Sequence, residues 1–218
     1  MAKGRHHRER AAGKLARKLG KRPPYPRILI VCEGKKTEPQ YFEEIRILNR
    51  VPSAHVKVVH SEFGTQPRQV VDYAEALFKK SKAFEHIYAV FDRDQHTTYH
   101  DALTRAGQLK GALRNDEKKP VSFTPVPSVP CFELWLLLHY ANIQAYFERD
   151  EIYNRLRQHL PVYTKGAHGI FATTSPALAQ ATQRAMALQG LFNPFAGNEP
   201  YTNADRLVAL LISVRVER

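Results

Sequence analysis

The part of the sequence that most constrains the fold is a short apolar run that ends abruptly within residues 27–39. The run extends from Ile28 to Cys32 without polar alternation, which is typical of a strand buried on both faces of a sheet. Glu33 and Gly34 stop the run, and helix-starting residues follow. We therefore expect Glu33 where a central parallel strand ends and a helix begins, the edge at which open α/β sheets bind ligands.

The residues after this strand carry the signals of a helix start. Thr37 can act as an N-cap, with Gln40 three residues later as its capping-box partner. Pro39 falls in the first turn, where its missing N–H is tolerated. The sequence thus predicts a strand, a tight bend that carries a carboxylate, and then a helix.

Apolar runs and amphipathic segments alternate over residues 27–128. The predicted strands are 27–32, 56–60, 86–91 and 121–126, and the predicted helices are 38–49, 68–80 and 97–112. Strands separated by single helices form βαβ units with right-handed crossovers. We therefore expect an α/β fold in which about four parallel strands are flanked by helices.

The alternation ends after Pro130, and the remaining chain is predicted to be helical. Helices are expected at 131–147, 149–159, 176–190 and 203–215, with a loop at 161–173. We expect one domain over residues 27–218, with an α/β core at 27–128 and a helical extension at 130–218.

The chain is strongly basic, with 33 Lys and Arg against 21 Asp and Glu and a formal net charge of +12 over 218 residues. This charge implies a polyanionic partner, nucleic acid above all, although a basic solvated face is the alternative. No apolar run approaches the roughly 18 residues of a membrane span, and the charged N-terminus lacks the apolar segment of a secretory signal. Two cysteines give no basis for a disulfide scaffold. We expect a cytoplasmic protein that does not bind membranes.

Residues 1–26 are the most basic segment and are expected to form a disordered arm. Its cations could contact backbone phosphates without reading the base sequence. The candidate nucleic-acid-binding residues are Lys14, Arg17, Lys18, Lys21 and Arg22. A tail that only improves solubility is the alternative, and the sequence does not decide between the two.

Two carboxylates follow the predicted strand 86–91. Asp92 and Asp94 are two positions apart, so in an extended chain they point to the same side. Close carboxylates repel each other unless a cation lies between them, and oxygen ligands favour Mg²⁺ or Mn²⁺ over zinc. Together with Glu33 they form a candidate metal site that could hold hydrated Mg²⁺ against a phosphate. The alternative is an Asp-x-Asp pair in an ordinary turn.

Three further residues could contribute to catalysis. Glu133 lies in the most apolar segment of the chain, so its carboxylate is either on an exposed side of a helix or buried with a partner. Its place in a first helical turn would also suit the helix dipole. Lys36 and Lys165 could stabilise negative charge on a phosphate, although most such lysines are simply exposed.

Taken together, these motifs resemble those of the RloB-like family, which belongs to the Toprim (topoisomerase–primase) superfamily. The resemblance extends from residue 27 to the C-terminus and rests on Glu33-Gly34-x-Lys36-Thr37-Glu38-Pro39, Phe91-Asp92-x-Asp94, Phe132-Glu133-x-Trp135 and Tyr163-x-Lys165. It implies a Rossmann-like Toprim fold, an acid–base or metal role for Glu33, Mg²⁺ binding by Asp92 and Asp94, and a place for Glu133 in the site. Lys35 departs from the family pattern, which usually has an acidic residue at this position.

The resemblance also implies a component of bacterial defence, encoded near restriction systems or beside an ATPase partner. We expect a metal-dependent nuclease that cleaves phosphodiester bonds of DNA or RNA with Mg²⁺ or Mn²⁺. The alternative is a non-catalytic module that binds nucleic acid or a nucleotide and signals to an ATPase or another effector. The sequence leaves the kind of nucleic acid, the cleavage specificity and the oligomeric state open.

Overall fold

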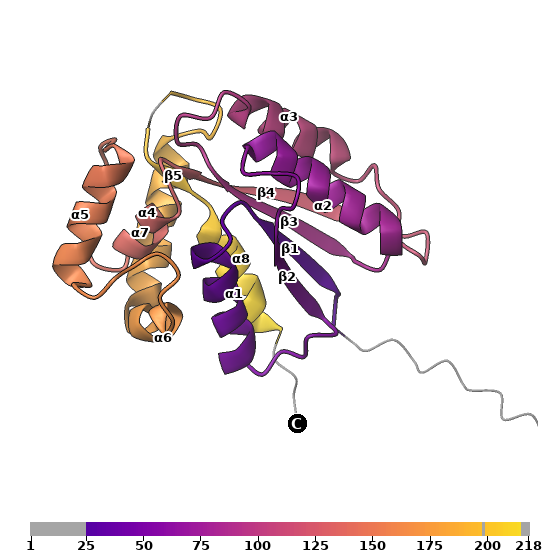
Figure 1. The fold of residues 1–218 in the computed structure, drawn as a ribbon, viewed down its shortest axis with the longest axis horizontal. Helices are drawn as coiled ribbons and strands as arrows, with labels where there is room; N and C mark the ends of the chain where they lie inside the picture. The colour runs from indigo at the N-terminus through magenta and orange to yellow at the C-terminus, as the bar shows by residue number, and fades with distance from the viewer. Residues whose placement is uncertain (1–24, 198, 215–218) are drawn as a thin grey trace, which may run out of the picture.

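The computed structural model describes residues 25–197 and 199–214, which form a five-stranded sheet between helices (Figure 1). The strands are β1 (Ile28–Cys32), β2 (Val56–His60), β3 (His86–Asp92), β4 (Ser122–Val129) and β5 (Tyr201–Thr202). Their order is β2-β1-β3-β4-β5; the first four are parallel, and β5 is antiparallel to β4. The predicted α/β fold with four parallel strands is confirmed, and β5 is an addition.

Helices cover both faces of the sheet. Helices α2 (Pro67–Ser81) and α3 (Tyr99–Leu109) pack on one face, and α1 (Thr37–Leu48) and α8 (Ala204–Ser213) pack on the other (Figure 1). The other helices are α4 (Glu133–Leu137), α5 (Arg149–His159), α6 (Ile170–Thr174) and α7 (Leu178–Leu191). None of the helices in the described ranges is long and apolar enough to cross a membrane.

The central position of β1 in the sheet explains why this strand is apolar throughout. Ile28, Ile30 and Cys32 pack into the core below α1 and α8. Leu29 and Val31 point to the other face and pack into the core below α2 and α3. Because side chains alternate between the two faces of a strand, an unbroken apolar run is what a central strand with two buried faces requires.

The winding of the chain creates a crevice at one end of β1 and β3. The crossover after β1 carries α1 and the crossover after β2 carries α2, and these helices lie on opposite faces of the sheet. A reversal of this kind leaves an open crevice at the carboxyl ends of the two strands. Glu33 directly follows β1, and Asp92 ends β3. The backbone N–H of Glu33 donates to the Val90 carbonyl of β3 at 2.9 Å.

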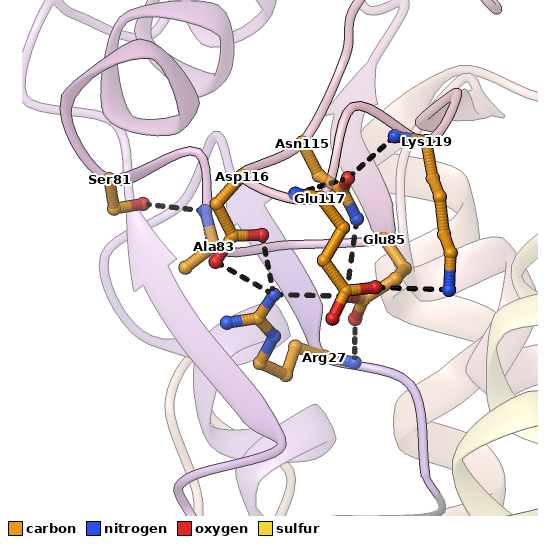
Figure 2. Close-up of polar contacts among 8 residues, drawn as sticks. All are labelled: Arg27, Ser81, Ala83, Glu85, Asn115, Asp116, Glu117 and Lys119. Carbon is orange, nitrogen blue, oxygen red and sulfur yellow. Dashed lines mark hydrogen bonds and ion pairs between the residues drawn. The ribbon is translucent and has the colours of Figure 1, made fainter. Parts of the chain in front are cut away.

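A polar network fixes the opposite, amino-terminal end of these strands (Figure 2). The Arg27 guanidinium pairs with Glu85 at 3.0 Å and with Asp116 at 3.1 Å. Glu85 also accepts the backbone N–H of Arg27 at 2.6 Å, and the Asn115 amide donates to Glu85 at 3.4 Å. Because Arg27 precedes β1 and Glu85 precedes β3, the network holds in register the two strands that carry acids at their far ends.

The predicted helix at 131–147 is wrong in length, because α4 ends at Leu137 and residues 141–148 are not helical. In a longer helix the Leu138 carbonyl would accept the N–H four residues later. It accepts a hydrogen bond from Arg184 of α7 at 2.7 Å instead. Residues Leu134 to Leu138 are all buried, so the apolar character of the segment gave no indication of where the helix ends.

Two local predictions also differ from the structure. Helix α6 begins at Ile170, within the segment 161–173 that was expected to be a loop. Thr37 is not the N-cap, because α1 begins at Thr37 and no side chain caps it. The Thr37 hydroxyl instead accepts the backbone N–H of Gly166 at 3.2 Å. This contact holds the loop that carries Lys165 against the start of α1.

Candidate active site

A cavity of about 400 Å³ opens at the carboxyl ends of β1 and β3. It brings together the predicted catalytic and metal-binding residues Glu33, Lys36, Asp92, Asp94, Glu133 and Lys165. The other lining residues are Gly34, Lys35, Thr37, Glu38, Thr65, His96, Phe132 and Arg149. The cavity therefore combines five carboxylic acids with four lysine or arginine side chains, a mixture that suits a phosphate bound through cations.

A slightly larger cavity of about 450 Å³ runs along α1. Its walls include Pro39, Ile47, Leu48 and Val58, and the charged residues among them are Glu43 and Glu44. Apolar and acidic walls without lysine or arginine do not suit a polyanion. The cavity at the strand ends is therefore the candidate site.

Glu33 and Asp92 form the floor of the site. One carboxylate oxygen of Glu33 accepts the backbone N–H of Asp92 at 2.9 Å, and the other lies 3.2 Å from Nε2 of His96. Burial, together with the nearby carboxylates of Glu38 and Asp94, raises the pKa of Glu33 to about 8. Burial, together with the carboxylates of Glu38, Glu33 and Glu133, holds the pKa of Asp92 well above its usual range. Both groups thus favour a proton, or another cation, close to them.

Asp94 faces the same cavity, although not through strand alternation. Strand β3 ends at Asp92, and Asp94 has a φ of 40°, in the left-handed region that Asp tolerates better than most residues. Its backbone N–H donates to the Pro130 carbonyl at 2.9 Å. Its carboxylate forms an ion pair with Arg149 at the start of α5. A turn therefore places the second Asp where the sequence pattern predicted it.

Glu38 is a site residue that the sequence pattern did not reveal. It lies in the first turn of α1, is buried, and accepts the backbone N–H of Gly34 at 3.2 Å. Burial, with Glu133 nearby, raises the pKa of the Glu38 carboxyl. A Cβ atom on Gly34 would lie 2.3 Å from a Glu38 oxygen, so any larger residue there would have to displace the Glu38 carboxylate. From the sequence alone, an acid that faces a site cannot be told from one that lies in a first helical turn only because the helix dipole favours it there.

Glu133 is buried and has partners, which is one of the two arrangements expected for it. The same carboxylate oxygen accepts hydrogen bonds from the hydroxyls of Tyr153 at 2.6 Å and Tyr163 at 2.9 Å. Burial and the Glu133 carboxylate raise the pKa of both phenols, so they remain protonated donors. Tyr153 lies on α5 and has no sequence signal, because its role depends on how α5 packs against α4.

The lysines form the rim of the cavity. Lys35, Lys36 and Lys165 line the cavity and are exposed. The Lys165 ammonium lies 5.2 Å from the centre of the Tyr153 ring, within cation–π range. Gly166 has a positive φ, and a Cβ there would lie 2.7 Å from the Lys36 side chain. A glycine at this position therefore lets the Lys165 loop approach Lys36.

The donor set fits a hard divalent cation. Beyond burial, the Glu38 carboxylate raises the pKa of both Glu33 and Asp92, and Glu33 raises the pKa of Asp92; a bound cation would relieve this repulsion. Their oxygen atoms are preferred ligands of Mg²⁺ and Mn²⁺. Within residues 25–197 and 199–214, no group of three or more His, Cys, Asp or Glu side chains is arranged so that it could hold a metal ion. Mg²⁺ usually keeps several waters and takes only one or two carboxylates, which Asp92 and Asp94 can provide.

Comparison with protein-family models matches residues 28–211 to the family described as RloB-like protein. This match covers well over half of the 218 residues. The chain belongs to the RloB-like family. The matched part of this RloB-like protein runs from β1 into α8 and includes every residue of the cavity. No curated protein and no solved structure matches the chain.

The structure does not describe the residues that are predicted to bind nucleic acid. Lys14, Arg17, Lys18, Lys21 and Arg22 lie outside the described residues. Glu38, His96, Arg149 and Tyr153 are the additions that the structure makes to the predicted site. His96 and Arg149 had no sequence signal, because each contacts an acid that is far away in the chain.

Proposed function

We propose that this RloB-like protein is a metal-dependent nuclease that hydrolyses phosphodiester bonds of DNA or RNA. The observation that carries the proposal is the cavity at the ends of β1 and β3, with its floor of buried carboxylates and its rim of exposed lysines. A phosphodiester is an anion, so it can approach carboxylates only where cations lie between them. The lysine rim and a cation on the floor would provide that bridge.

Asp92 and Asp94 are the proposed ligands of Mg²⁺, or of Mn²⁺ in its place, with Glu33 beside them. When bound, the cation polarises the phosphate and orients or activates the attacking water. The Asp92 carboxylate accepts the backbone N–H of Phe132 at 2.9 Å, and the Asp94 backbone is bonded to Pro130. The segment that follows β4 therefore positions both ligands through main-chain hydrogen bonds.

Glu33 is the proposed proton-transfer residue. Without a cation its pKa is about 8; a cation bound beside it would lower this pKa, so that the carboxylate could accept a proton from the attacking water. His96 lies 3.2 Å away and offers an adjacent acceptor for that proton. Lys36 and Lys165 are proposed to stabilise charge on the phosphate. Glu133, held by two tyrosine hydroxyls, completes the acidic floor.

The expected binding partners are inferred from the net charge of the chain and from its family. The net charge of +12 supports nucleic acid as the substrate. The family resemblance supports a role in bacterial defence, with an ATPase encoded nearby as the expected protein partner. The competing hypothesis is a binding module that signals to an effector. That hypothesis predicts that Asp92→Ala and Asp94→Ala leave both nucleic-acid binding and biological activity unchanged.

The experiment that tests the nuclease proposal is a substrate panel. Purified protein is incubated with single- and double-stranded DNA, RNA and tRNA, in Mg²⁺, Mn²⁺ or EDTA, beside Asp92→Ala. We expect at least one substrate to be cut only with metal and only by the wild type. Binding without cutting by either protein, even with the expected ATPase present, would favour the signalling module.

A further inference from the structure

Arg149 has a position that the stability of its own helix does not explain. It is the first residue of α5, and a positive charge at a helix N-terminus opposes the helix dipole. Asp150 and Glu151, which follow it, have the favourable sign. Arg149 instead reaches across the cavity to the carboxylate of Asp94, which lies 55 residues earlier in the chain. Its position is therefore explained by the site.

The Arg149 guanidinium also has room to move. Its side chain is 30 % exposed and that of Asp94 is 27 % exposed, so the pair lies at the mouth of the cavity, away from the packed core. The guanidinium also lies 5.9 Å from the Tyr153 ring, and the carboxylates of Asp92 and Glu133 attract it in addition to Asp94. The carboxylate that Arg149 holds is one of the two proposed cation ligands.

From this geometry, and resting on the nuclease function proposed above, we infer that Arg149 is a cation-released phosphate-binding residue. Without metal, Arg149 neutralises Asp94 and occupies the place that the divalent cation needs. When the cation binds to Asp94, it displaces the guanidinium, which then turns to an oxygen of the substrate phosphate. Arginine suits this role, because its planar group is always charged and can bind either a carboxylate or a phosphate with two parallel hydrogen bonds.

The first test measures cation binding without nucleic acid. Calorimetric titration with Mn²⁺ would compare the wild type with Arg149→Ala, and with Arg149→Gln as a second variant that keeps the side-chain stem. Lys35→Ala is the matched control, because it removes one positive charge from the same cavity without touching Asp94. We expect Mn²⁺ to bind about tenfold more tightly to the Arg149 variants, and no more than about threefold more tightly to Lys35→Ala, whose charge is exposed to solvent.

A double variant shows whether the effect acts through Asp94. On the Asp94→Asn background, we expect Arg149→Ala to change Mn²⁺ affinity no more than Lys35→Ala does. Equal Mn²⁺ affinity in the wild type and both Arg149 variants would overturn the inference about Arg149 but not the proposed metal-dependent function. The same would follow if Arg149→Ala raised Mn²⁺ affinity as much on the Asp94→Asn background as in the wild type. Failure of every protein to bind Mn²⁺ would overturn it together with the proposed metal-dependent function.

The second test measures binding to a short oligonucleotide, in Ca²⁺ as a cation that supports little cleavage and again in EDTA. If cation binding frees Arg149, its replacement by Ala should weaken oligonucleotide binding about tenfold in Ca²⁺ and by less than about twofold in EDTA. Arg149→Lys should recover part of the loss, since it keeps the charge but not the planar group. An equal loss in both conditions would contradict release by the cation.

Discussion

The Glu33 carboxylate accepts a hydrogen bond from the backbone N–H of Asp92 at 2.9 Å, across 59 residues of sequence. This bond joins the carboxyl ends of β1 and β3, the two strands that meet at the crevice of the sheet. It brings one acidic group against the backbone of another in a buried place, where neither can be fully solvated. The properties of the site follow from this crowding of acids.

The first prediction concerns stability and pH. The folded state holds the pKa of Glu33 at about 8, whereas its ordinary value is 4.5. The folded protein therefore binds this proton more tightly than the unfolded chain does. The stability that results is fully present below about pH 4.5 and is lost as pH rises through about 8. In EDTA at pH 8.5, Glu33→Gln should be about 2 kcal/mol more stable than the wild type.

Urea unfolding at pH 5 and pH 8.5 would measure this effect. The matched control is Glu151→Gln, which changes a half-exposed glutamate on α5 that pairs with Arg155 at the surface and should shift the free energy of unfolding by less than about 0.5 kcal/mol at both pH values. A Glu33→Gln variant with the same pH dependence as the wild type would contradict the proposed proton on Glu33.

The second prediction concerns Gly34. A Cβ on this residue would lie 2.3 Å from a Glu38 oxygen, so Gly34→Ala must displace a buried carboxylate. We expect the substitution to lower the free energy of unfolding by about 1–3 kcal/mol and to weaken Mn²⁺ binding. In Gly107→Ala, on α3, the new Cβ would meet nothing within 4 Å, and a gain of about 0.5–1 kcal/mol is expected. If both substitutions had the same effect, the contact between Gly34 and Glu38 would not be required.

The third prediction concerns the two tyrosines on Glu133. Tyr153→Phe and Tyr163→Phe each remove one donor to a buried carboxylate and should each cost about 1–2 kcal/mol. The double variant should cost more than the sum, because it leaves this oxygen without either donor. Tyr140→Phe is the control, since no hydrogen bond to its hydroxyl occurs among the described residues. If urea unfolding shows that the double variant costs only the sum of the two single variants, the two tyrosines do not act through a shared carboxylate.

The fourth prediction concerns the basic arm. If Lys14, Arg17, Lys18, Lys21 and Arg22 each contact a phosphate, replacing all five with Gln should make the slope of log affinity against log salt shallower by about four. Deletion of residues 1–22 should have at least this effect. Fluorescence anisotropy across a salt series would measure the slope. An unchanged slope would leave the arm without a role in binding.

The central strands could be predicted from sequence because their burial is visible in it. The apolar runs at 27–32 and 86–91 match β1 and β3, and the helices between the strands follow from amphipathic spacing. Helix α4 could not be predicted in length, because its end depends on Arg184 of α7, a contact between distant segments. Strand β5 is two residues long, too short for any periodic pattern.

The site could be predicted in part for a similar reason. Glu33 directly follows β1, Asp92 ends β3 and Asp94 lies two residues later, so their place at the ends of apolar runs marks these acids in the sequence. Glu38 and Arg149 lie on helices, where charged residues are common on solvent-facing sides. Only the packing of α1 and α5 around the strand ends shows that these two side chains face the cavity.

The most direct test of the nuclease account is the rate of cleavage as a function of Mg²⁺ concentration, measured for the wild type and Asp92→Asn on the best substrate of the panel. Nucleic-acid affinity is measured in parallel. The account predicts saturable, Mg²⁺-dependent cleavage by the wild type, and a rate at least about a thousandfold lower for Asp92→Asn with affinity retained. Cleavage that persists in EDTA, or an Asp92→Asn variant that cuts as fast as the wild type, would contradict it.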